Sequence, residues 1–130
     1  MKAELYYLGL TAALTGILWL PYVLDRIMTG GLLDAIGYPS NPKPQSAWAQ
    51  RLMKAHKNGI DNLVVFGVLV LVAHAMGISN EKIATAAVVF FWARVGHALA
   101  YTMKLPLART LTFFVGFLAQ AAVAWQILMA

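Results

Sequence analysis

A run of polar side chains lies along one face of a predicted helix at residues 51–66, RLMKAHKNGIDNLVVF. At about 100° per residue, these side chains fall within an arc of roughly 100°. They are Arg51, Lys54, Asn58, Asp61 and Asn62. The second half of the segment is strongly apolar, and a charge that faces acyl chains costs roughly 3 kcal/mol on insertion scales. The stripe therefore has to face partner helices or water, which makes it the first candidate for a functional site.

A second polar set lies in residues 90–101, FFWARVGHALAY. Arg94, His97 and Tyr101 have the spacing i, i+3, i+7, so they share one face of a helix. An unperturbed histidine can exchange protons near neutral pH. Arg109 and Thr110 follow in the first turns of the next predicted helix, where an arginine and a hydroxyl at a helix N-terminus suit an anion.

Together these sets predict a pocket rich in cations and hydrogen-bond donors, with one carboxylate at Asp61. A fitting ligand is amphipathic and mainly anionic, with an ammonium or amide group for Asp61 and Asn58. No metal site is predicted, because His56, His74 and His97 are scattered and no two stand at i, i+4. The absence of cysteine excludes disulfides and a protein thiol nucleophile.

The composition is that of an integral membrane protein. Hydrophobic residues make up 61% of the 130 residues and charged residues 12%, whereas a soluble domain has roughly 25% charged residues. The mean hydropathy is +0.69. The net charge is +5, but the basic residues stand singly at the ends of apolar segments, so nucleic-acid binding is not predicted.

Four apolar segments are long enough to span a bilayer, at about residues 5–24, 47–76, 81–103 and 107–129. They predict a single domain over residues 1–130, an all-α bundle of four transmembrane helices. Residues 21–26, PYVLDR, are interpreted as the point where the first span leaves the membrane. Glycines and prolines in residues 25–46 argue against a continuous helix there.

Basic residues favour one side of the membrane. The first and third loops, with their helix ends, hold Arg26, Lys43, Arg51, Lys104 and Arg109, and the other side has only Lys2 and Lys82. The positive-inside rule therefore predicts that loops one and three are cytoplasmic and that both termini lie outside. Both polar stripes and the start of the fourth span then lie in the same cytoplasmic half.

The chain resembles the MAPEG family, the membrane-associated proteins in eicosanoid and glutathione metabolism. The resemblance is carried by RLMKAHKNGIDN at residues 51–62 and by RVGHALAY at 94–101, followed by ART at 108–110. It covers nearly the whole chain. It implies a four-helix membrane protein, a homotrimer with glutathione held between neighbouring subunits, and here a bacterial-type member in the inner membrane.

The resemblance also implies roles for individual residues. In the second span the family has an arginine, an asparagine four residues on and a glutamate three further, which hold the carboxylates and the ammonium of glutathione. Lys54, Asn58 and Asp61 stand at these positions. Lys54 replaces a bidentate group with a point charge, and Asp61 is one methylene shorter than glutamate. Lys57 matches a basic residue that some members have before the asparagine.

Further matches lie in the other spans. Arg94, His97 and Tyr101 match a set seen in eicosanoid-type members, and Arg109 matches the arginine thought to stabilise the thiolate. Thr110 stands where one branch has a serine. The ligand-binding residues expected in all are Arg26, Arg51, Lys54, Lys57, Asn58, Asp61, Arg94, His97 and Tyr101, with Arg109 and Thr110 at the reacting thiol.

These residues are consistent with two functions. The first is a glutathione S-transferase or peroxidase for lipophilic electrophiles, in which Arg109 lowers a thiol pKa of about 8.5 by about 1–2 units. The second is a non-catalytic trimeric membrane protein that binds a lipid or another amphipathic anion in the same pocket. Lys54 and Asp61 favour the second function, and Arg109 and Tyr101 favour the first. A purely structural stripe of inter-helix ion pairs is a third interpretation.

Overall fold

The computed structural model describes residues 2–130, and this part of the chain contains helices joined by loops and turns, without strands. The helices are α1 (Ala3–Ile17), α2 (Trp19–Gly30), α3 (Leu32–Ile36), α4 (Ala47–Ala75), α5 (Glu81–Thr102) and α6 (Pro106–Leu128). Four stretches in residues 2–130 are long and apolar enough to cross a membrane, with α1 and α2 together forming the first. The all-α membrane bundle is thus confirmed, and the chain is an integral, multi-pass membrane protein.

The first span is kinked, and it is longer than the sequence predicted. α1 ends at Ile17, α2 resumes at Trp19 and helical structure continues to Gly30, so the helix does not end near residue 24 or within residues 21–26. Pro21 lies in the first turn of α2, where the missing N–H of a proline is tolerated. The helix ends where Gly31 takes a φ of 88°, a conformation that glycine adopts readily.

His56 of α4 holds this kink. Its Nε2 lies 2.8 Å from the carbonyl oxygen of Thr15, and its Nδ1 lies 2.8 Å from the hydroxyl of Tyr22. Because a carbonyl only accepts, Nε2 is the donor and Nδ1 accepts from Tyr22. One ring therefore bonds to residues on both sides of the break between α1 and α2.

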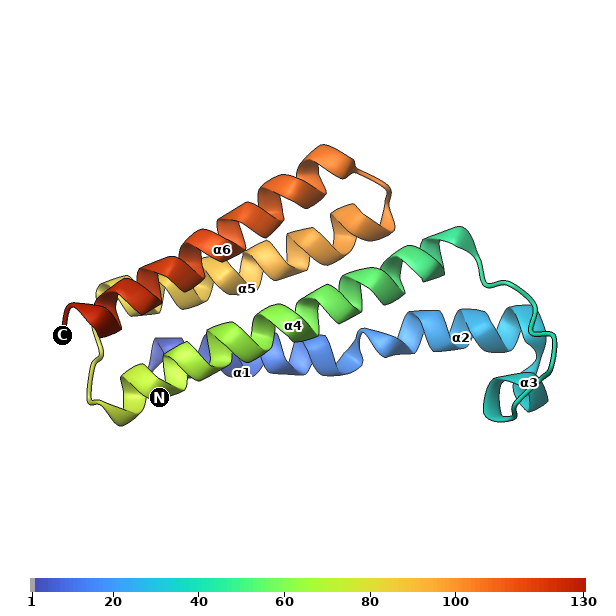
Figure 1. The fold of residues 1–130 in the computed structure, drawn as a ribbon, viewed down its shortest axis with the longest axis horizontal. Coiled ribbons are helices and arrows are strands. Elements are labelled where there is room, and N and C mark those ends of the chain that lie inside the picture. Colours follow the sequence, from blue (N-terminus) through green and yellow to red (C-terminus); the bar gives the residue numbers. More distant parts are fainter. Residues whose placement is uncertain (1) are drawn as a thin grey trace.

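The start of α4 is fixed by a side chain of α2. The hydroxyl of Ser46, the residue before α4, donates to Oδ1 of Asp25 (2.6 Å), and the backbone N–H of Ser46 donates to Oδ2 (3.0 Å). Nε2 of Gln45 donates to the carbonyl oxygen of Tyr22 (2.7 Å). The loop that follows α3 thus returns along α2 and is anchored there before α4 begins (Figure 1).

The apolar core occupies one half of the bundle, near the α4–α5 turn. α5 is the most buried span and packs against α1, α4 and α6. The rings of Phe66 and Phe90 stack with their centroids 4.0 Å apart. The core is made of Phe66, Val70, Ala73, Ile83, Ala86, Ala87, Phe90, Ala119 and Val123. The buried polar residues Arg94 and His97 lie in the other half of the bundle, nearer the α5–α6 turn.

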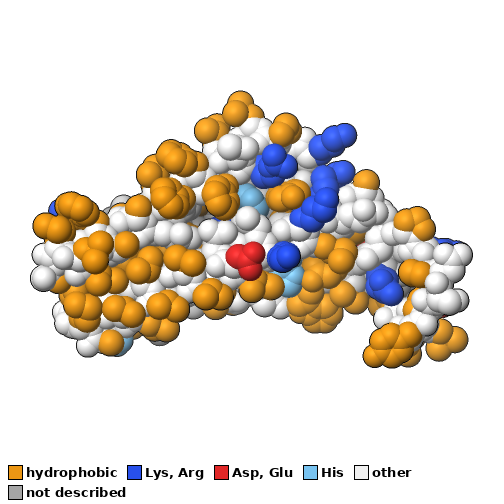
Figure 2. All heavy atoms as spheres, viewed as in Figure 1, with side chains coloured by type: hydrophobic (Ala, Val, Ile, Leu, Met, Phe, Trp, Pro, Cys, Tyr) orange, Lys and Arg blue, Asp and Glu red, His pale blue; other side chains and the backbone are white. Residues whose placement is uncertain are grey.

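The outer surface is mostly apolar, as expected for helices in lipid. Val64, Leu71 and Phe117 are among many large hydrophobic side chains that are exposed. Figure 2 shows hydrophobic side chains over the left part of the visible face, whereas Lys and Arg side chains gather toward the α5–α6 turn. Charge is therefore concentrated in the half of the molecule that the apolar core leaves free.

Candidate functional site

The polar stripe of α4 is divided along its length. Arg51, Asn58 and Asn62 are partly buried and bond to other residues, whereas Lys54 and Asp61 are exposed. The difference arises because α5 and α6 pack against one edge of the stripe only, where they supply the partners of Arg51, Asn58 and Asn62. The buried edge belongs to the interior of the bundle, and the charged edge faces outward.

Arg51 is engaged at a helix end. Its Nε donates to the carbonyl oxygen of Thr102, the last residue of α5, at 2.9 Å. The last carbonyls of a helix lack intrahelical partners and attract cations. Arg51 therefore stabilises the end of α5 through a backbone carbonyl.

Arg94 is the most unusual side chain of the site. Only 5% of its surface is exposed. Its Nη2 donates to Oδ1 of Asn58 (2.7 Å) and lies 3.3 Å from Nδ1 of His97. Its Nε and Nη1 are buried and have no hydrogen-bond partner among residues 2–130. Gly59 of α4 lies beside this guanidinium, and a Cβ at that position would make an ordinary contact of 3.7 Å with Nη2.

The guanidinium dictates how the neighbouring amides are turned. Arg94 can only donate, so the oxygen of Asn58 must face it and the amide nitrogen of Asn58 must face away. Nδ2 of Asn62 donates to the backbone oxygen of Asn58 (2.9 Å), which leaves the oxygen of Asn62 to accept from Nε2 of Gln120 (3.0 Å). A continuous network thus joins α6, α4 and α5, in which Gln120 donates to Asn62 and both Asn62 and Arg94 donate to Asn58.

Gln120 is not among the site residues that the sequence predicts, and Asn62 is predicted only as part of the polar stripe. Gln120 is buried, with 8% of its surface exposed. Its signal in the sequence is a lone amide in the apolar segment 107–129, since polar residues inside a span usually face the protein interior.

A small cavity brings residues of three helices together. It has a volume of about 180 Å³ and is lined by Asn58, His97, Tyr101, Arg109, Thr110 and Phe113. A second cavity of about 270 Å³ shares Tyr101 and Arg109 and extends to Arg51 and Lys104. Five of the predicted site residues therefore surround one cavity, and Arg51 lines its neighbour.

Arg109 and Tyr101 form a pair between the two cavities. The guanidinium carbon of Arg109 lies 5.2 Å from the centroid of the Tyr101 ring, within the range of a cation–π interaction. The ring of His97 meets the same tyrosine edge to face, at 5.6 Å. Thr110 is exposed, and its hydroxyl donates to the carbonyl oxygen of Pro106 at 3.0 Å, so its one proton is engaged by the helix backbone.

The remaining predicted residues lie outside both cavities. Lys54, Lys57 and Asp61 are exposed on α4, and none of them lines either cavity. Arg26 lies on α2, which extends beyond the start of α4 toward α3 (Figure 1). The single chain thus brings together the predicted residues around the smaller cavity and leaves Arg26, Lys54, Lys57 and Asp61 apart from it.

The sequence model of the MAPEG family matches residues 5–129 of the chain. The chain belongs to the MAPEG family. No curated protein matches this MAPEG chain. The matched range includes nearly all of the four spans and every side chain that lines the two cavities. Membership fits a membrane protein of glutathione or lipid metabolism.

Proposed function

We propose that this MAPEG protein is a glutathione transferase that acts on lipophilic electrophiles, with the ligand held in the cavity beside Asn58 and Arg109. The observation that carries the proposal is Arg94, a buried guanidinium with two unpaired nitrogens, bonded to two residues that line this cavity. Leaving charged donors buried and unpaired is unfavourable. A carboxylate satisfies a guanidinium better than any neutral group.

The donor set fits glutathione, which has two carboxylates, a thiol and one ammonium group. Arg94 and Arg109 supply positive charge, and the orientation of Asn58 leaves its amide nitrogen for the cavity that it lines. Nδ1 of His97 accepts from Arg94, so its Nε2 carries a proton and is a further donor. Asp61, three residues after Asn58 on the exposed edge of α4, is the group proposed to hold the ammonium.

Arg109 is proposed to hold the sulfur in its reactive form. When bound, glutathione supplies a thiolate, its thiol proton having been released to water. The sulfur bonds to an electrophilic carbon of a compound dissolved in the bilayer, and that carbon releases its leaving group, which is halide for an aryl halide. Arg109 is held over Tyr101 at the start of α6 and offers a fixed positive charge there. The Thr110 hydroxyl proton is engaged by Pro106, so we assign charge stabilisation to Arg109 and only a bordering position to Thr110.

We further propose that the protein acts as a homotrimer whose subunits complete each other's sites. The cavity of about 180 Å³ is smaller than the roughly 300 Å³ at which ligand pockets begin. Lys54, Lys57 and Asp61 present charge on an outward face within a membrane span, where contact with acyl chains is unfavourable. A neighbouring subunit would cover this face and enlarge the cavity at the same time.

A second function is favoured by one observation. Lys54 and Asp61, which differ from the pattern of the glutathione-binding members, both lie outside the cavity of the protomer. A membrane protein that binds another amphipathic anion on Arg94 and Arg109 without catalysis would need neither of them.

The two functions are separated by measuring conjugation of glutathione to an aryl halide together with thermal stabilisation by glutathione in detergent. For Arg109→Ala we expect kcat/KM at neutral pH to fall at least about tenfold, because a nearby cation lowers a thiol pKa by about one unit or more. Arg109→Lys retains the charge and part of the rate. Lys43→Ala, in the exposed loop before α4, is the control and changes neither measurement.

Each outcome decides between the functions. Stabilisation without turnover supports the binding protein, and an unchanged rate in Arg109→Ala contradicts the role given to this residue. If glutathione neither stabilises the protein nor reacts, the glutathione proposal is wrong.

A further inference from the structure

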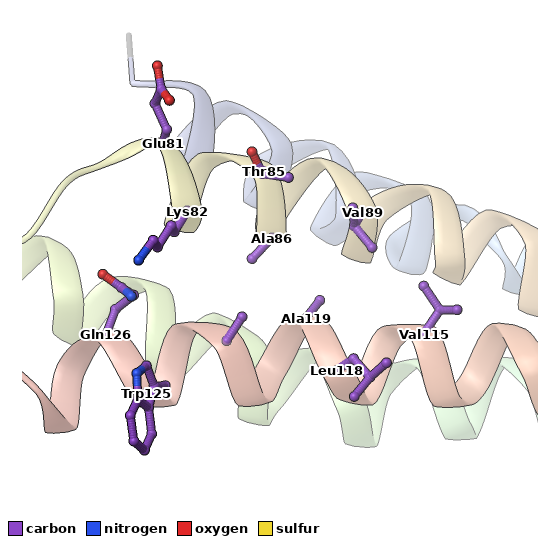
Figure 3. Close-up of a pocket in the computed structure, with 11 residues that line it drawn as sticks. Glu81, Lys82, Thr85, Ala86, Val89, Val115, Leu118, Ala119, Trp125 and Gln126 are labelled. Carbon is purple, nitrogen blue, oxygen red and sulfur yellow. The ribbon is translucent and has the colours of Figure 1, made fainter.

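A larger cavity lies at the opposite end of α5 from the polar site. It is a groove of about 650 Å³ between α5 and α6, and Figure 3 shows the side chains that line it. Apart from its polar end, the lining is mostly small and apolar, with Ala86, Val89, Val115, Leu118, Ala119 and Ala122. None of its residues belongs to the glutathione site proposed above.

The position of the groove determines where its occupant comes from. α5 and α6 are both membrane spans, and Val89, Val115 and Leu118 on the groove are exposed. The groove therefore opens toward the acyl chains of the bilayer along its length. An apolar groove in this position is suited to a hydrocarbon chain.

One end of the groove is polar, and it lies where α5 begins and α6 ends. Lys82 stands in the first turn of α5 and Gln126 in the last turn of α6, and Figure 3 shows both side chains pointing toward the mouth of the groove. Glu81 also lines this end of the groove, but its carboxylate points away from α6. Trp125, half exposed, lies at the same end, as tryptophans do at membrane interfaces.

The orientation of the Gln126 side-chain amide is set by its hydrogen-bond partner Asn80. Oδ1 of Asn80 accepts from the backbone N–H of Ile83 at 3.0 Å, as the N-cap of α5. Nδ2 of Asn80 is therefore the donor to Oε1 of Gln126, at 2.8 Å. This leaves the amide nitrogen of Gln126 directed away from Asn80. A cation and an amide donor thus stand together at the N-terminus of α5, whose dipole adds positive potential.

We propose that the groove binds a phospholipid of the surrounding leaflet, with one acyl chain along α5 and α6 and the headgroup phosphate on Lys82 and Gln126. An apolar channel that ends in a cation and donors at the membrane interface matches the two parts of such a lipid. A phosphate is preferred over a cationic headgroup because the carboxylate of Glu81 points away from the mouth.

The chain-binding part is tested by native mass spectrometry of the full-length protein, titrated in detergent with phosphatidylglycerol. Ala122 lines the groove and is exposed, and its neighbour Ala121 is exposed outside it. Ala122→Phe fills the groove, so we expect its apparent affinity to fall at least about tenfold, because several methylene groups lose their burial. Ala121→Phe is the matched control and binds as the unchanged protein does.

The headgroup part is tested with a second probe, diacylglycerol, which has the acyl chains and no phosphate. The unchanged protein should prefer phosphatidylglycerol by about tenfold, as expected for a charge-assisted contact. In Lys82→Glu this preference should disappear while diacylglycerol binding is kept. Lys43→Glu, which makes the same charge change in an exposed loop, should keep the preference.

Equal lipid binding by Ala122→Phe and Ala121→Phe overturns the proposal. So does a change of oligomeric mass in Ala122→Phe alone, which would assign the groove to a contact between subunits. Glutathione-induced stabilisation, measured on the same variants, should be unchanged, so the lipid site and the glutathione site are tested separately.

Discussion

Nη2 of Arg94 donates a hydrogen bond of 2.7 Å to Oδ1 of Asn58, and this bond joins α5 to α4 in the polar half of the bundle. The bond does more than connect two helices. Since a guanidinium has no acceptor, it fixes which side of the Asn58 amide faces the cavity. The ligand preference of the cavity is therefore set by a residue that is itself almost completely buried.

Replacing Arg94 by methionine should separate stability from ligand binding. The arginine makes two hydrogen bonds, each worth about 1.5–3 kcal/mol for a charged donor, but it also leaves two buried nitrogens unpaired, at a penalty of about 1–3 kcal/mol each. These terms nearly cancel. We expect the free energy of unfolding without ligand to change by less than about 1 kcal/mol, while stabilisation by glutathione is lost.

Both quantities are read from unfolding curves in detergent, with and without glutathione. Lys43→Met is the control and leaves both unchanged. If Arg94→Met retains the full stabilisation by glutathione, Arg94 does not bind the ligand.

Gln120→Leu should weaken glutathione binding although Gln120 does not line the cavity. Without the donor on α6, the oxygen of Asn62 loses its partner. Asn62 is then held less firmly, and its bond to Oδ1 of Asn58, which supports the orientation set by Arg94, is weakened. We expect the dissociation constant to rise about threefold to tenfold, within the usual worth of one hydrogen bond. It is measured by isothermal titration in detergent.

Two comparisons show whether Gln120 acts through Asn62. Gln126→Leu makes the same substitution in the same helix, but its partner is Asn80, so glutathione affinity should not change. The double variant Gln120→Leu/Asn62→Leu should bind as weakly as Asn62→Leu alone, because coupled residues are not additive. Additive losses would show that Gln120 acts independently of Asn62.

Substitutions of Tyr101 should reveal how Arg109 is positioned. Tyr101→Phe keeps the ring under the guanidinium, and we expect kcat/KM for conjugation to stay within about threefold, since the cation–π interaction uses the ring face. Tyr101→Leu removes the ring and should lower kcat/KM about tenfold, which corresponds to the upper range of such contacts. Equal losses in both variants would instead assign the function of Tyr101 to its hydroxyl.

His56 should prove to be a structural histidine. In His56→Leu the carbonyl of Thr15 and the hydroxyl of Tyr22 lose their partner at the kink. We expect the free energy of unfolding to fall by about 1–3 kcal/mol, with glutathione affinity unchanged. His74→Leu is the control, since His74 is exposed at the end of α4 and a surface change is usually worth less than about 0.5 kcal/mol. Reduced glutathione affinity in His56→Leu would show that the kink shapes the site.

Much of the architecture follows from the pattern of the sequence. The four apolar runs predicted the four spans, because each has to cross the hydrocarbon layer as a helix. The spacing of His97 and Tyr101 placed them on one face, and antiparallel packing brought them to Arg109 and Thr110 around one cavity. These relations depend only on helix geometry and on the order of the spans.

Other features could not be read from one helix at a time. The stripe on α4 covers an arc of roughly 100° in a helical projection, and the projection gives no sign that α5 covers one edge and leaves Lys54 and Asp61 exposed. The partner of Arg51 is a backbone carbonyl of α5, which no side-chain pattern reveals. The kink near Leu18 depends on His56, which lies far along the chain.

The contact between Asp25 and Ser46 has a consequence for the order in which the protein is built. Asp25, whose carboxylate accepts a hydrogen bond from the backbone N–H of Ser46, lies on α2 and is synthesised before α4. When Ser46 leaves the ribosome, its partner is already in place, so the beginning of α4 is defined by chain that has already emerged. The contact that fixes the start of α4 is therefore made entirely by chain that is synthesised before α5 and α6.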